Sequence, residues 1–183
     1  MSMDGRRRLF CRAFHHDILQ LFAIYITLEP MTNHQRVGSV SNAHVGREFE
    51  ALAAVHYLGA ETWKLIPNFS VELGVGSFKR GHRFDLGCEE PPILIECKSH
   101  NFTVSGNMPS AKITVWNEAM YFFHLAPDRY RKILFVLEAK HERQRETLAS
   151  SYARNYGHLI PSGVEVVEYN TETKALRVVP HGV

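Results

Sequence analysis

Three charged residues interrupt apolar segments near the middle of the chain, in the stretch RFDLGCEEPPILIECKSH. Asp85 follows one apolar segment, and Glu96 and Lys98 break the next. Strand side chains alternate between faces, so Glu96 and Lys98 share a face, and a turn over the intervening Gly, Pro and Glu residues brings Asp85 beside them. Two close carboxylates repel unless a cation lies between them, and oxygen donors suit Mg²⁺. Such an ion can activate water and stabilise charge on a phosphodiester.

These residues carry a resemblance to a known family. Asp85 followed by Glu96-Cys97-Lys98, behind a helix that carries Glu50, resembles the PD-(D/E)xK nuclease superfamily over roughly residues 45 to 140. The resemblance implies a restriction-endonuclease-like α/β fold, with a mixed-sheet core in the order αβββαβ flanked by helices. The sequence departs from the motif at Phe84, which stands where the superfamily's name has a proline.

The resemblance also implies an activity and a role for each residue. Asp85, Glu96 and Glu50 would bind Mg²⁺ (or Mn²⁺ as a substitute), the backbone carbonyl of Cys97 would add a ligand, and Lys98 would act on the attacking water. The chain would then be a metal-dependent endonuclease that hydrolyses DNA phosphodiester bonds. Restriction or phage defence is the role this implies first, a repair or junction-resolving nuclease the alternative, and a homodimer is a further expectation.

Two glutamates compete for the position on the first helix. The segment GREFEALA, residues 46 to 53, resembles the first helix of modification-dependent restriction enzymes and junction resolvases. Glu50 matches the metal-reaching glutamate best. Glu48 is the alternative, because it lies about 200° away around the helix and one of the two can face the site.

A second ExK pattern lies further along the chain, with Pro127 and Asp128 before Glu138 and Lys140. One strand without a turn separates Asp128 from Glu138. Ten residues at about 3.3 Å each place those carboxylates on the order of 30 Å apart, too far for one metal ion. The geometry therefore favours the site at Asp85.

Five further residues near the site are candidates for binding nucleic acid. Cations supply most of the affinity for a phosphate backbone, and polar loops beside a site often carry contacts. The candidates are Arg80, His82, Arg83, His100 and Lys112. Their alternative interpretations are a charged strand edge for the first three and a plain loop connection for the others.

The pattern of apolar and turn residues predicts a mixed sheet with helices packed on it. Helices are expected at residues 45–58, 110–125 and 142–159. Strands are expected within residues 62–76, 79–87, 93–100 and 132–138, with a closing hairpin at 164–170 and 175–179. Residues 45–183 would form one nuclease-like domain behind an N-terminal extension, residues 1–44.

Composition sets few limits on function. The 183 residues carry a formal net charge of +2, which permits a nucleic-acid partner without requiring one. Three scattered cysteines favour a reducing cytoplasm over a disulfide framework. The apolar run at residues 21–28 is far shorter than the roughly 20 residues of a membrane helix, so no membrane partner is expected. Met31 is an alternative start of the chain.

Two other classes of function remain open from the sequence. The first is a nuclease-like domain that binds nucleic acid or a partner without cutting. The second is an unrelated α/β domain in which the charged residues only solubilise the fold. A wide separation of Asp85 and Glu96 in space would favour the second.

Overall fold

The computed structural model describes residues 42–60 and 64–182, which fall in one unit of the chain, Val40–Val183. The first described element, helix α2 (Asn42–Ala60), begins three residues before the predicted helix. The rest of the predicted N-terminal extension, the apolar run and Met31 lie outside the described residues. Among the helices that the structure describes, none is long and apolar enough to cross a membrane.

Six strands form one mixed sheet in the order β1-β2-β3-β4-β5-β6. Their bounds are β1 Ile66–Leu73, β2 Arg80–Cys88, β3 Ile93–Lys98, β4 Arg131–Leu137, β5 Val164–Tyr169 and β6 Leu176–Val178. Strands β3, β4 and β5 pair in parallel, and the remaining neighbours are antiparallel. The predicted α/β class, mixed sheet and closing hairpin are confirmed.

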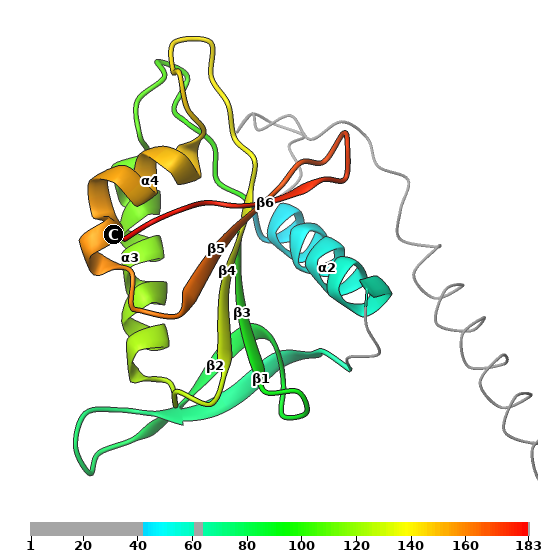
Figure 1. Cartoon of the computed structure of the whole chain (residues 1–183), viewed down its shortest axis with the longest axis vertical. Coiled ribbons are helices and arrows are strands. Elements are labelled where there is room, and N and C mark those ends of the chain that lie inside the picture. The colour runs from blue at the N-terminus through cyan, green and yellow to red at the C-terminus, as the bar shows by residue number, and fades with distance from the viewer. Residues whose placement is uncertain (1–41, 61–63, 183) are drawn as a thin grey trace, which may run out of the picture. The chain divides into compact units, whose positions relative to one another are not determined.

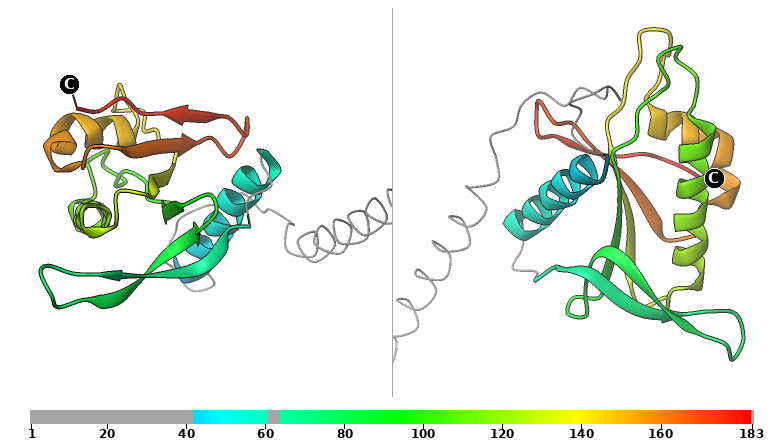
Figure 2. Two further views of the ribbon diagram at one scale, coloured as in Figure 1. Left: turned by 60° about the horizontal axis from the view of Figure 1, so that its bottom comes forward. Right: turned by 180° about the vertical axis from the view of Figure 1, so that it is seen from behind.

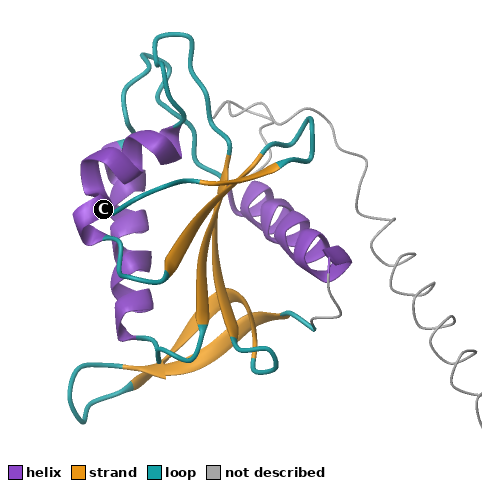
Figure 3. Ribbon diagram, viewed as in Figure 1, coloured by secondary structure: helices purple, strands orange, loops and turns teal. Residues whose placement is uncertain are grey.

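Helices cover both faces of the sheet, as Figures 1 and 3 show. Helix α3 (Ser110–Leu125) connects β3 to β4, and α4 (Leu148–Tyr156) lies in the connection from β4 to β5. These two helices pack on one face, around Trp116 and Tyr152. Helix α2 packs on the other face, where Phe49 contacts Phe135 with ring centroids 5.1 Å apart. The sheet core is therefore closed on both sides, as parallel strands require.

The third predicted helix is wrong over its first six residues. Residues 142–147 form a loop, α4 begins at Leu148, and a short 3₁₀ helix (Gly157–Leu159) follows it. Thr147 caps the helix, because its side chain accepts a hydrogen bond from the Ser150 backbone N–H. The loop instead binds its neighbour at residues 99–109, where Gln144 Nε2 donates to the Gly106 carbonyl at 2.6 Å.

Candidate active site

The site lies where β2 and β3 separate. Their ladder runs from Cys88 opposite Ile93 to Leu86 opposite Ile95. Beyond it β2 continues beside β1 to Arg80, whereas β3 continues beside β4. Asp85 and Glu96 are the first residues past the last rung, so their side chains enter the gap that opens between the strands.

A break in the side-chain alternation of β2 directs Asp85 into this gap. Residues two apart on a strand normally share a face. Phe84, however, packs in the core beneath α3 and α4, whereas Leu86 packs in the core beneath α2. The two parts of β2 on either side of Asp85 therefore direct these side chains to opposite faces of the sheet. On the paired strand β1, the residue between the rungs Pro67–Leu86 and Phe69–Phe84 is Asn68, which has a φ of 54°.

Three side chains and one backbone group meet in the gap. Asp85 Oδ2 accepts a 2.7 Å hydrogen bond from the Cys97 backbone N–H and lies 3.4 Å from Lys98 Nζ. Lys98 Nζ also donates to Glu96 Oε2 at 2.6 Å. The predicted meeting of Asp85, Glu96 and Lys98 is therefore present, and the wide separation that would have favoured a merely solubilising role is not.

Burial and mutual repulsion govern the charges of this cluster. Burial and then the Glu96 charge raise the pKa of Asp85, against the opposing effect of Lys98. Burial would also raise the pKa of Glu96, but the hydrogen bond with His82 and the charge of Lys98 outweigh it, so this pKa is lowered. Burial disfavours the Lys98 ammonium, yet the two carboxylates raise its pKa. The ammonium is thus the counter-ion that both carboxylates share.

Helix α2 contributes Glu50 to the same electrostatic cluster. Burial, and after it the charge of Asp85, raises the pKa of Glu50, while Lys98 lowers it. Glu50 also acts on the buried Cys97 thiol, whose pKa is raised first by burial and then by Asp85. These interactions make Glu50 a helix carboxylate that acts on the site.

The donor atoms suit a hard cation, but they are not arranged as a complete coordination site. All three acidic side chains offer oxygen. The pKa values of Asp85 and Glu50 are raised first by burial and then by repulsion between carboxylates, and a bound cation would relieve this repulsion. Within residues 42–60 and 64–182, no group of three or more His, Cys, Asp or Glu side chains is arranged to hold a metal ion. The residues fit Mg²⁺ chemically, and Lys98 would have to give up contacts with the carboxylates.

His82 has a contact that the sequence prediction missed. Its Nε2 lies 3.3 Å from Glu96 Oε1, and its ring stacks on Phe122 with centroids 3.7 Å apart. The sequence predicts His82 as a phosphate ligand, and in the fold its ring also packs on α3 beside the site. The period-two pattern could have indicated this, because His82 and Phe84 occupy one face of β2.

The other predicted nucleic-acid ligands differ in exposure. Arg80, Arg83 and Lys112 are exposed, the first two on β2 and the third in the first turn of α3. His100 is half-buried, and the Trp116 indole N–H donates to its Nδ1 at 2.8 Å. Burial, helped by Lys112 and Lys98, lowers the pKa of His100 to about 4. His100 therefore offers a hydrogen bond rather than a charge at neutral pH.

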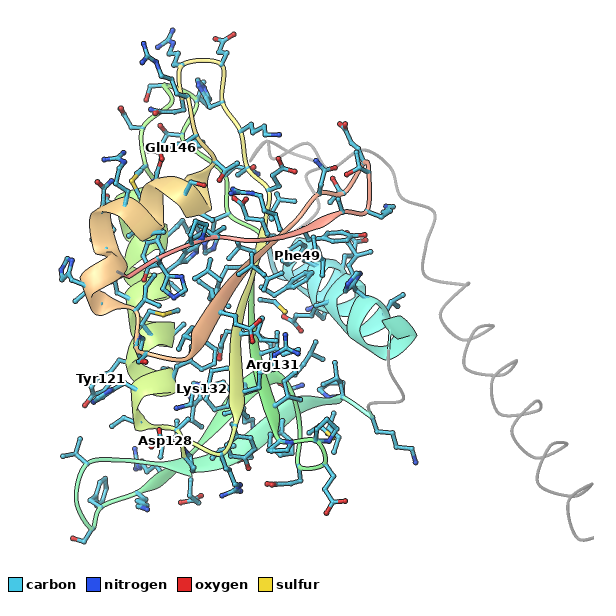
Figure 4. All side chains as sticks on the ribbon, in the orientation of Figure 1. Phe49, Tyr121, Asp128, Arg131, Lys132 and Glu146 are labelled. Carbon is cyan, nitrogen blue, oxygen red and sulfur yellow. The ribbon has the colours of Figure 1, made fainter. Side chains whose placement is uncertain are left out.

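The competing ExK pattern does not assemble. Asp128 precedes β4 and Glu138 follows it, so the strand separates them as predicted. Figure 4 shows Asp128 at the opposite end of the fold from Glu146, which lies in the loop after Lys140. Asp128 forms a 3.7 Å ion pair with Lys132, and Glu138 pairs with Lys140.

Comparisons with known proteins add no relative to this description. No protein-family model, no curated protein and no solved structure matches the chain significantly. Functional interpretation therefore rests on the cluster at Asp85, Glu96 and Lys98 and on the helix and strands around it.

Proposed function

We propose that this chain is a metal-dependent endonuclease of the PD-(D/E)xK type, with a restriction-endonuclease-like core, which hydrolyses phosphodiester bonds in DNA. The main support is the meeting of two carboxylates and an ammonium at the fork of β2 and β3. Lys98 Nζ lies 2.6 Å from Glu96 Oε2 and 3.4 Å from Asp85 Oδ2. A buried cluster of this kind is costly, and perturbed groups of this kind gather at functional sites.

Each residue of the cluster would have a role that follows from its chemistry. Asp85, Glu96 and Glu50 would hold Mg²⁺, with the Cys97 carbonyl as a further oxygen donor. When bound, Mg²⁺ supplies Lewis-acid stabilisation of the phosphate and lowers the pKa of a bound water. Lys98, released from its pairing with the carboxylates, would orient the attacking water and neutralise charge on the phosphate.

Two features of the fork support this division. The Cys97 N–H donates to Asp85 Oδ2, which fixes that carboxylate against β3. The side chain of Glu96 is largely buried between Lys98 and His82, which fixes the second carboxylate. Ligands held in this way lose little conformational entropy when an ion binds.

The test is nicking of supercoiled plasmid in Mg²⁺ and in EDTA by the intact chain, Lys98→Ala and Lys140→Ala. Lys140 is a matched control, since it belongs to an ExK pattern on the exposed loop. We expect metal-dependent cutting that is lost in Lys98→Ala and kept in Lys140→Ala. The substrates should include methylated and unmethylated plasmid and a branched duplex, so that restriction and junction-resolving activities are both covered.

Two results would contradict this function. Loss of cutting in Lys140→Ala with full activity in Lys98→Ala would move the site to the pair of Glu138 and Lys140 that follows β4. Failure of the intact chain to cut any of these substrates would contradict the proposed endonuclease activity.

A second candidate is a nuclease-like domain that binds DNA without cutting it. It is favoured by the Lys98 ammonium, which already pairs with both carboxylates, and because no three-ligand group is arranged for a metal in the described part of the chain. Calorimetric titration with Mn²⁺ separates the candidates. Uptake that disappears in Asp85→Asn supports the nuclease, and no uptake by the intact chain supports the silent domain.

A further inference from the structure

Strands β1 and β2 continue past the site as a two-stranded ribbon. Val71 pairs with His82 and Leu73 with Arg80. Every residue from Val75 to Gly81 is exposed, so little of the fold covers this end of the ribbon. The left view of Figure 2 shows the turn of the ribbon projecting beyond the rest of the sheet. The ribbon is therefore an arm whose base packs on the core through Val71, Leu73 and His82 and whose end, residues 75–81, is exposed.

The turn of this arm is tight and carries two exposed apolar side chains. A Cβ on Gly74 would lie 2.0 Å from the Phe78 carbonyl oxygen, so a close backbone approach requires glycine there. Gly76 adopts a φ of +64°. Val75 is 69% exposed and Phe78 is 74% exposed. Packing within the fold does not account for these two side chains.

The arm is also basic. From Val71 to Arg83 it carries the cations Lys79, Arg80 and Arg83 against one carboxylate, Glu72. All three cations are exposed, and Lys79 and Arg80 directly follow Phe78. A surface with this charge complements a phosphate backbone.

We propose that the β1–β2 arm binds in the major groove of duplex DNA. That groove, about 12 Å wide, admits a two-stranded β-ribbon, and apolar side chains there contact thymine methyl groups. Phe78 and Val75 would make such contacts, while Lys79, Arg80 and Arg83 bind the flanking phosphates. Double-stranded RNA is a poorer fit, because its major groove is deep and narrow.

The arm also sets a distance between this contact and the candidate site, and this part rests on the proposed nuclease function. Asp85 lies seven residues after Phe78, which corresponds to at most about 23 Å of extended chain, and the path from Arg80 onward follows β2. That length matches roughly seven base pairs of duplex at about 3.4 Å each. The groove contact would then position the duplex on one side of the phosphate to be cut.

The experiment is fluorescence anisotropy of a 30-base-pair DNA duplex with the full chain in EDTA, which separates binding from cleavage. The test variants are Phe78→Ser and the double variant Lys79→Gln/Arg80→Gln. Matched controls on strand β6 and the turn before it are Val178→Ser, which is also exposed, and Lys174→Gln.

We expect Phe78→Ser to weaken binding about fivefold to tenfold, and both controls to bind like the intact chain. The double variant should reduce the slope of log K against log salt by about 2, one unit for each phosphate contact. Methyl green, a major-groove ligand, should displace the protein, and netropsin, a minor-groove ligand, should not. An RNA duplex of the same sequence should bind at least tenfold more weakly.

The outcomes distinguish failure of the arm proposal from failure of the proposed nuclease function. The inference is overturned if both arm variants bind like the intact chain, if netropsin alone displaces the protein, or if the intact chain does not bind duplex DNA. A change in sedimentation of Phe78→Ser with unchanged DNA binding would instead assign the tip to a contact between protein copies. DNA binding that depends on the arm, without cutting of plasmid, would support the major-groove contact and contradict the proposed nuclease activity.

Discussion

Replacing Lys98 by Met tests whether its ammonium stabilises the two carboxylates of Asp85 and Glu96. Met keeps most of the aliphatic stem and removes the charge. The side chains of Lys98, Glu96 and Asp85 are 13%, 8% and 25% exposed. Breaking a buried ion pair costs about 3–5 kcal/mol, because a charge is left without compensation. Partial exposure of Asp85 reduces this, so we expect the free energy of unfolding to fall by about 2–4 kcal/mol.

Urea unfolding at neutral pH in EDTA, followed by circular dichroism, measures this loss. Lys140→Met is the control, since Lys140 is exposed and its pairing with Glu138 should contribute less than about 1 kcal/mol. The double variant Lys98→Met/Glu96→Gln removes one carboxylate with the ammonium, so it should be more stable than Lys98→Met alone. Mg²⁺ at ten times its dissociation constant should return about 1.4 kcal/mol to Lys98→Met.

The reasoning fails if Lys98→Met loses no more stability than Lys140→Met. That result would mean that water, rather than Lys98, screens Asp85 and Glu96. A loss of the expected size without recovery in Mg²⁺ would keep the ion-pair argument and contradict the metal ligands.

Three other predictions concern the surroundings of the site. The pKa of His100 is about 4 in the folded chain and 6.5 unfolded, so unfolding takes up a proton between these values and stability should fall as pH drops from 6.5 to 4. Urea unfolding at pH 7 and pH 5 should show a loss of about 1–2 kcal/mol that is absent in His100→Asn, which keeps an acceptor for Trp116. Phe49→Ala should cost about 3–5 kcal/mol in thermal or urea unfolding, because the ring is fully buried against Phe135; a loss below 1 kcal/mol would contradict this packing. Thr147→Ala should cost about 1 kcal/mol by the same measurement through loss of the α4 cap, and an unchanged midpoint would contradict the cap.

Much of the fold could be predicted because each strand and helix carries its own periodic signal. Residues 110–125 have apolar spacing bounded by Pro109 and Pro127, and the structure forms α3 over the same range. Residues 142–147 differ from the predicted helix because Glu, Arg and Gln favour helices, whereas contacts with the loop at 99–109 decide their conformation. Local propensity does not indicate a partner that lies 38 residues away in the sequence.

The meeting of Asp85, Glu96 and Lys98 follows from local pattern, because side-chain alternation and one turn bring them to the same end of two strands. The sequence also ruled against Asp128 and Glu138, because one straight strand separates them. The surroundings and charges of this cluster depend on the tertiary structure. The separation of β2 from β3, the burial that leaves Lys98 as shared counter-ion, and the stacking of His82 on Phe122 all depend on how α2, α3 and the sheet pack. Burial and long-range charge are properties of the assembled fold, and no stretch of residues carries them alone.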